Sequence, residues 1–108
     1  MANDEELLAC RLDVVEQASL MAEYGHVART AVVDVRRAGS RLEVSVSRSD
    51  EADARVGRIV EAERVCCPFM DVTVDQDAGS LLVTYSGPDA IGPVLDMIEA
   101  RVGPPAGT

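Results

Sequence analysis

The chain has 108 residues, of which 47 % are hydrophobic. This is enough for one ordered domain with a core of its own. All ten basic residues are arginine, and the net charge is −9. Because a chain this acidic repels phosphate backbones, we do not expect nucleic acid as a partner. No apolar run approaches the length of a membrane span. We therefore expect one domain over residues 1–108, with flexible tails at 1–6 and 103–108 and no membrane partner.

The first six residues are acidic and lack the positive region and apolar core of a secretory signal. This predicts a cytoplasmic protein, whose three cysteines are kept reduced. An odd number of cysteines also argues against a complete set of disulfides.

The first half of the chain predicts a helix, a hairpin and a second helix. Residues 7–12 are either an extra strand or the lead-in to the first helix. Asp13 and Glu16 have the spacing of a capping box, which opens a helix near residues 14–28. Alternating residues on both sides of a turn then predict a hairpin over 30–47. The apolar stripe of the first helix is expected at Val14, Ala18, Met21, Gly25 and Ala28.

The second helix is expected to be capped by Asp50 and to end near Pro68, which cannot continue it regularly. A second hairpin follows over 70–85, and Pro88 is expected to begin a last helix. The predicted fold is α+β in the order α-ββ-α-ββ-α: one antiparallel sheet built from two β-hairpins, with helices on one face and a ferredoxin-like flavour. The apolar stripe of the last helix is expected at Ile91, Val94, Leu95, Ile98 and Val102.

Two adjacent cysteines, Cys66 and Cys67, lie where the second helix meets the following strand. Glu63 lies one helical turn before both of them and on the apolar stripe of the helix, where a carboxylate is costly unless it has a partner. This combination makes the pair the strongest candidate for a site.

Three interpretations of the pair are open. The thiolates could bind a soft metal or metalloid ion, with Cys10 as third ligand and Glu63 beside the ligands rather than on the ion. They could instead serve redox or nucleophilic chemistry, although the C-terminal end of a helix and a nearby carboxylate raise rather than lower a thiol pKa. The third interpretation is that buried cysteines simply pack as small hydrophobic residues.

The segment Glu63-Arg64-Val65-Cys66-Cys67-Pro68-Phe69 resembles a poorly characterised group of short bacterial proteins and domains with a Glu-x-x-Cys-Cys-Pro-Phe motif. The likeness extends to residues 9–12 and to residues 87–95. Some members occur with, or are fused to, regulators of the mercury-resistance type. The resemblance implies handling or sensing of thiophilic metals, with Cys10, Cys66 and Cys67 acting together and a regulatory protein as a partner.

Our sequence-based hypothesis is a small cytoplasmic thiol protein that binds or senses a thiophilic metal or metalloid through Cys10, Cys66 and Cys67. The alternative is a small thiol-dependent or redox enzyme of a bacterial, secondary-metabolic pathway, in which Cys66 and Cys67 act catalytically with Glu63 as acid/base. A domain of this size also gains buried apolar surface by pairing with a copy of itself, so a homodimer is expected in either case.

Overall fold

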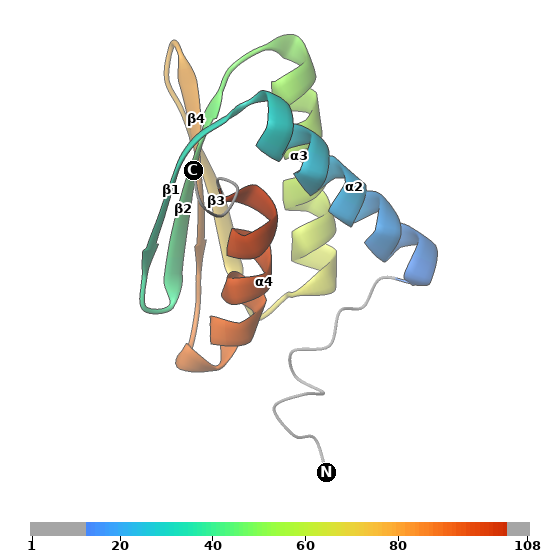
Figure 1. Ribbon diagram of the computed structural model, residues 1–108. Coiled ribbons are helices and arrows are strands. Elements are labelled where there is room, and N and C mark those ends of the chain that lie inside the picture. Colours follow the sequence, from blue (N-terminus) through green and yellow to red (C-terminus); the bar gives the residue numbers. More distant parts are fainter. Residues whose placement is uncertain (1–12, 104–108) are drawn as a thin grey trace.

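The computed structural model describes residues 13–103 and confirms the predicted α+β order α-ββ-α-ββ-α (Figure 1). The two tails and the predicted element at residues 7–12 lie outside the described residues. A short 3-10 turn, Asp89–Ile91, precedes the last helix. The elements are α2 (Val14–Thr30), β1 (Val32–Ala38), β2 (Arg41–Ser47), α3 (Asp50–Cys66), β3 (Asp71–Gln76), β4 (Ser80–Ser86) and α4 (Gly92–Val102).

The four strands form one antiparallel sheet in the order β1-β2-β4-β3. Within the hairpins β1 pairs with β2 and β3 pairs with β4. The two hairpins join along β2 and β4, where Val44 lies opposite Val83. Gly39 turns the first hairpin with a φ of 57°, a conformation that side-chain-bearing residues rarely adopt. The alternation of the strands thus decides which side chains point into the core.

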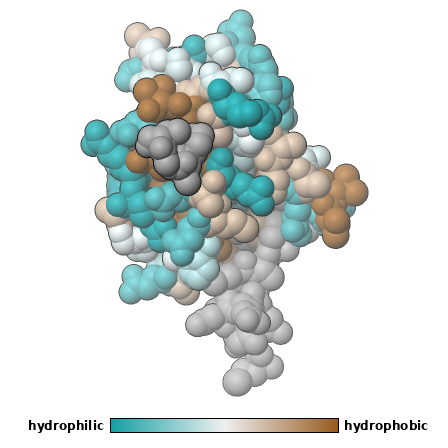
Figure 2. Space-filling view, in the orientation of Figure 1, coloured by the Kyte–Doolittle hydropathy of each residue, from teal (hydrophilic) through white to brown (hydrophobic). Residues whose placement is uncertain are grey.

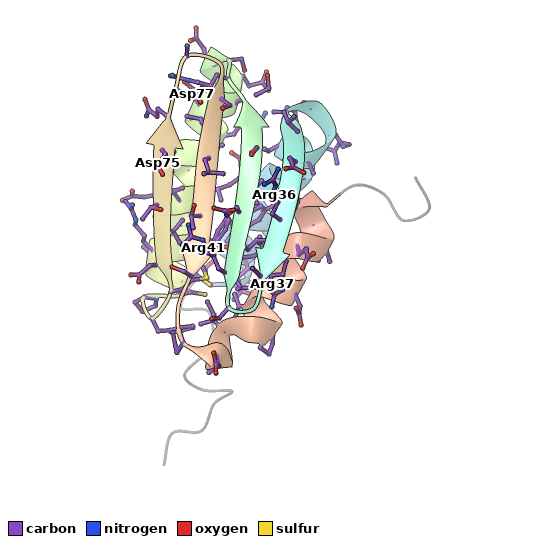
Figure 3. All side chains as sticks on the ribbon, turned by 90° about the vertical axis from the view of Figure 1, so that its left-hand side faces the viewer. Arg36, Arg37, Arg41, Asp75 and Asp77 are labelled. Carbon is purple, nitrogen blue, oxygen red and sulfur yellow. The ribbon has the colours of Figure 1, made fainter. Side chains whose placement is uncertain are left out.

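The helices cover one face of this sheet (Figure 1). α3 packs against β3, α4 packs against β1 and β2, and α2 packs mainly on α3 and α4. The other face has no described helix over it and carries polar side chains such as Arg36, Arg41 and Asp75 (Figure 3). An antiparallel sheet tolerates such a solvated face. The core lies between the sheet and the helices and includes Leu42, Val46, Val83, Ile59, Leu95 and Ile98.

The predicted inner face of α2 is wrong. Leu20, Tyr24 and Val27 are the buried residues of this helix, whereas Val14 is 82 % exposed. The expected stripe consisted largely of small residues, and burying the larger side chains of the neighbouring face removes more apolar surface from water. Figure 2 shows hydrophobic surface over the N-terminal end of α2, where Val14 and Val15 are exposed.

Two predicted helix starts also need correction. Ser49, not Asp50, caps α3, because its hydroxyl oxygen accepts the backbone N–H of Ala52 and Asp50 is already helical. Pro88 precedes the 3-10 turn rather than opening α4, which begins at Gly92. The expected capping box at Asp13 and Glu16 is present, and all five predicted stripe residues near α4 are buried.

Candidate metal centre

The end of α3 brings the two adjacent thiols together. Cys67 is the C-cap, with φ −129° and ψ 71°, and its N–H donates to the carbonyl of Glu63 over 2.7 Å. Pro68 disfavours helical geometry at the residue before it. Neighbouring residues inside a helix point about 100° apart, but this turn places Cys67 Sγ 3.5 Å from Cys66 Sγ.

Glu63 completes a compact group of three potential ligands. A carboxylate oxygen of Glu63 and the sulfur atoms of Cys66 and Cys67 all lie within 4.8 Å of one another. The three residues are 3 %, 5 % and 3 % exposed, respectively. The residues predicted from the end of α3 therefore form one buried cluster. The other predicted ligand, Cys10, lies outside the described residues.

The two cysteines of the cluster differ in redox state, contrary to the expectation that every cysteine is reduced. Cys66 is disulfide-bonded, whereas Cys67 is a free, buried thiol. The cluster consequently offers two sulfur ligands to an ion only after reduction.

A pair of tyrosines supports Glu63 from two other elements. Tyr24, on α2, donates its hydroxyl hydrogen to Glu63 Oε2. The hydroxyl oxygens of Tyr24 and Tyr85 are 3.1 Å apart. Because Tyr24 has only one hydroxyl hydrogen, Tyr85 donates to Tyr24 in this chain. A relay of hydrogen bonds thus runs from β4 through α2 to the carboxylate on α3.

Both tyrosines were missed at the sequence level, although a signal was present. Tyr85 alternates with the buried Leu81 and Val83, and Tyr24 lies one turn after Leu20. A buried tyrosine needs a hydrogen-bond partner for its hydroxyl group. Glu63 is a buried carboxyl group that needs a hydrogen-bond donor. The sequence could therefore suggest that a tyrosine donates to Glu63, but not which tyrosine.

Burial raises the pKa of Glu63 and Cys67 within the cluster and of the two tyrosines beside it. Burial raises the pKa of Glu63, and the hydrogen bond from Tyr24 offsets only part of that effect. Burial, and then the charge of Glu63, raises the pKa of Cys67 to about 12. Burial also raises the pKa of Tyr24 and of Tyr85. The direction expected for the thiol pKa is confirmed at Cys67, with burial as the main cause.

A crevice of about 280 Å³ leads to the cluster between α2, α3 and α4. Glu63, Cys66 and Cys67 contribute to its lining, and the remaining lining is largely apolar. The group is therefore buried but not sealed. The other lining residues are Gln17, Leu20, Met21, Val94, Met97 and Arg101.

No protein-family model, curated protein or solved structure matches this chain. Among the described residues, no helix has both the length and the apolar character needed to cross a membrane.

Proposed function

We propose that the reduced protein captures a thiophilic metal or metalloid ion through Cys66 and Cys67, in the reducing cytoplasm. The single observation that carries this proposal is the buried cluster in which both sulfur atoms and a carboxylate oxygen of Glu63 lie within 4.8 Å of one another. Thiolate ligands favour soft ions such as Cd²⁺, Hg²⁺ or trivalent arsenic over hard ions.

The raised pKa of Cys67 favours a ligand role over a nucleophilic one. A thiol whose pKa is about 12 is almost entirely protonated at neutral pH and is a poor nucleophile. A bound metal ion removes the protons of its thiol ligands, because binding and deprotonation are coupled. The ion would also compensate the carboxylate of Glu63, which has no ion-pair partner within residues 13–103.

Cys10, which lies outside the described residues, remains our proposed third thiol ligand. Gln17, in the second turn of α2, lines the same crevice as Cys66 and Cys67. Asp13, the N-cap of α2, is four residues before Gln17. The N-terminal part of α2 therefore borders the crevice that holds the thiol pair, and this supports the proposal for Cys10.

A titration of the reduced protein with Cd²⁺ under anaerobic conditions tests this proposal, read by the ultraviolet absorption of cadmium–thiolate bonds. We expect stoichiometric binding that is lost in the Cys66→Ser/Cys67→Ser double variant. Glu63→Gln should weaken binding, whereas its control Glu61→Gln, an exposed position on the same helix, should not. Stoichiometric binding that persists without both thiols would contradict the proposal.

A second candidate is thiol–disulfide exchange in a small redox enzyme. The free thiol of Cys67 lies 3.5 Å from the sulfur of the disulfide-bonded Cys66, as an attacking thiol would. Attack would form a bond between the sulfur atoms of Cys67 and Cys66 and break the existing disulfide of Cys66, and Glu63 would pass the proton of Cys67 to the departing thiolate. The raised pKa of Cys67 disfavours this candidate. Turnover of a small disulfide substrate at neutral pH, lost in Cys67→Ser, would favour it over ion capture.

A further inference from the structure

The crevice beside the thiols is much larger than an ion needs. Its volume is about 280 Å³, whereas one water molecule occupies about 30 Å³ in the liquid. A bare ion is held by its ligand atoms and gains nothing from apolar walls. Leu20, Met21, Val94 and Met97 nevertheless line the space next to Cys66 and Cys67. The walls therefore suit a ligand that carries an organic group on its thiophilic atom.

We propose that the preferred ligand is a monosubstituted trivalent arsenical, whose arsenic atom bonds to Cys66 and Cys67 and whose alkyl or aryl group fills this crevice. The inference rests on the proposed capture of a thiophilic ligand by the thiol pair, and it names the ligand class. The two sulfur atoms are 3.5 Å apart, close enough for one atom to bridge them.

The reaction is a condensation that balances without any change of oxidation state at arsenic. In the reduced protein, R–As(OH)₂ meets two thiols, two As–O bonds break and two As–S bonds form. Each thiol proton leaves with a hydroxyl group, so two water molecules are released. A cellular thiol must first reduce the disulfide of Cys66, and that thiol is oxidised in the exchange.

The residues of the cluster suit this condensation. Because each proton leaves in water, no free thiolate has to accumulate in the buried site. The carboxyl group of Glu63, within 4.8 Å of both sulfur atoms, can accept a thiol proton and pass it to the departing hydroxyl group. Tyr24 holds this carboxyl group in place by donating a hydrogen bond to Oε2.

The organic substituent also changes which thiols are needed. Inorganic arsenite has three hydroxyl groups to exchange and gains from a third thiol, the role proposed for Cys10. A monosubstituted arsenical has a carbon atom in that third position and bonds to two thiols only. Burying its organic group against the apolar walls replaces the missing third bond as a source of affinity.

Calorimetric titration of the protein, reduced with a phosphine and freed of it, tests this inference with phenylarsine oxide and sodium arsenite as probes. We expect phenylarsine oxide to bind one to one and at least about tenfold more tightly than arsenite, since every 1.4 kcal/mol is a factor of ten. Cys10→Ser should weaken arsenite binding and leave phenylarsine oxide binding unchanged.

A variant of the wall sharpens the test. Met97 is 49 % exposed, so Met97→Trp can narrow the crevice without disturbing the core. We expect the ratio of the phenylarsine oxide affinity to the arsenite affinity to fall at least about fivefold. Val33→Trp, at a position that is 69 % exposed on β1 and outside the crevice lining, is the control and should leave the ratio unchanged.

The failures of the two proposals are distinguishable. If phenylarsine oxide binds no more tightly than arsenite, or if Met97→Trp leaves the ratio unchanged, the inference about the crevice is overturned. Thiol-dependent binding of Cd²⁺ would then still support the proposed function. If neither Cd²⁺ nor the arsenicals bind to the reduced protein, both proposals are overturned.

Discussion

The interface between α2 and α3, which we call the seam, has a solvent side and a buried side. A carboxylate on each side lies in a different environment. On the solvent side, Glu23 forms ion pairs with Arg55 and Arg58. On the buried side, the neighbouring Tyr24 directs its hydroxyl group to Glu63, which lies beside Cys66 and Cys67.

The contrast shows what each carboxylate is suited for. Glu23 is neutralised by arginine and holds two helices together at a partly exposed place. Glu63 is buried among groups that donate hydrogen bonds or can lose protons, but it has no arginine partner within the described part of the chain. A buried carboxyl group without a countercharge tends to stay protonated or to meet a cation. This difference supports a ligand-binding role on the buried side.

The largest effect should be seen in the reactivity of Cys67. With a pKa of about 12, its thiolate fraction at neutral pH is about a thousandfold below that of an ordinary cysteine. We expect alkylation of Cys67 by iodoacetamide at pH 7 to be slower than that of an unfolded control peptide by at least this factor. The rate should rise tenfold per pH unit while the protein stays folded. Mass spectrometry of digested samples measures both, and equal rates for protein and peptide would refute the buried, protonated thiol.

Removing the hydrogen bond on Glu63 should have the next largest effect. Tyr24→Phe leaves the buried carboxyl group without its donor, which should lower the free energy of unfolding by about 1–3 kcal/mol. Tyr85→Phe removes only the donor to Tyr24 and should cost less. Urea unfolding at pH 7 measures both variants. A larger loss for Tyr85→Phe than for Tyr24→Phe would contradict the proposed direction of the relay.

The start of α2, on the side of the thiols, gives a smaller effect. Asp13 accepts the N–H of Glu16 over 2.8 Å, and Glu16 accepts the N–H of Asp13 over 3.2 Å. Asp13→Ala should lower the free energy of unfolding by about 1 kcal/mol. Asp13→Asn keeps an acceptor at the N-cap and should cost clearly less. Thermal unfolding compares the two, and an equal loss would argue against capping by the side chain.

The smallest effect is expected on the solvent side of the seam. Glu23→Gln removes the charge that pairs with Arg55 and Arg58, which should cost less than about 1 kcal/mol at a partly exposed position. The loss should shrink further at high salt because mobile ions screen the pairs. Binding of Cd²⁺ should be unchanged. Weakened binding in this variant would show that the two sides of the seam are coupled.

The order of the elements could be predicted from the sequence because each has a local signal. The alternation of Leu42, Val44 and Val46 gives a strand with one buried face, and the capping box at Asp13 and Glu16 opens a helix. The approach of the two thiols also follows from a local cause, the turn that Pro68 imposes on Cys67.

What could not be predicted depends on contacts between elements. The buried face of α2 depends on how this helix packs against α3 and α4. The periodicity of residues 14–30 alone does not contain that information. The relay of Tyr85, Tyr24 and Glu63 joins three elements that are distant in sequence. The crevice next to the thiols likewise exists only once α2, α3 and α4 are packed. The homodimer and the regulatory partner stay predictions.

X-ray absorption spectroscopy of the reduced protein loaded with one equivalent of Cd²⁺ tests the central claim most directly, because it identifies the atoms bound to the ion. We predict a first coordination shell with at least two sulfur atoms, which is lost in the Cys66→Ser/Cys67→Ser variant. A shell of oxygen and nitrogen atoms only, or a sulfur shell that survives the loss of both thiols, would contradict the assignment of Cys66 and Cys67 as ligands.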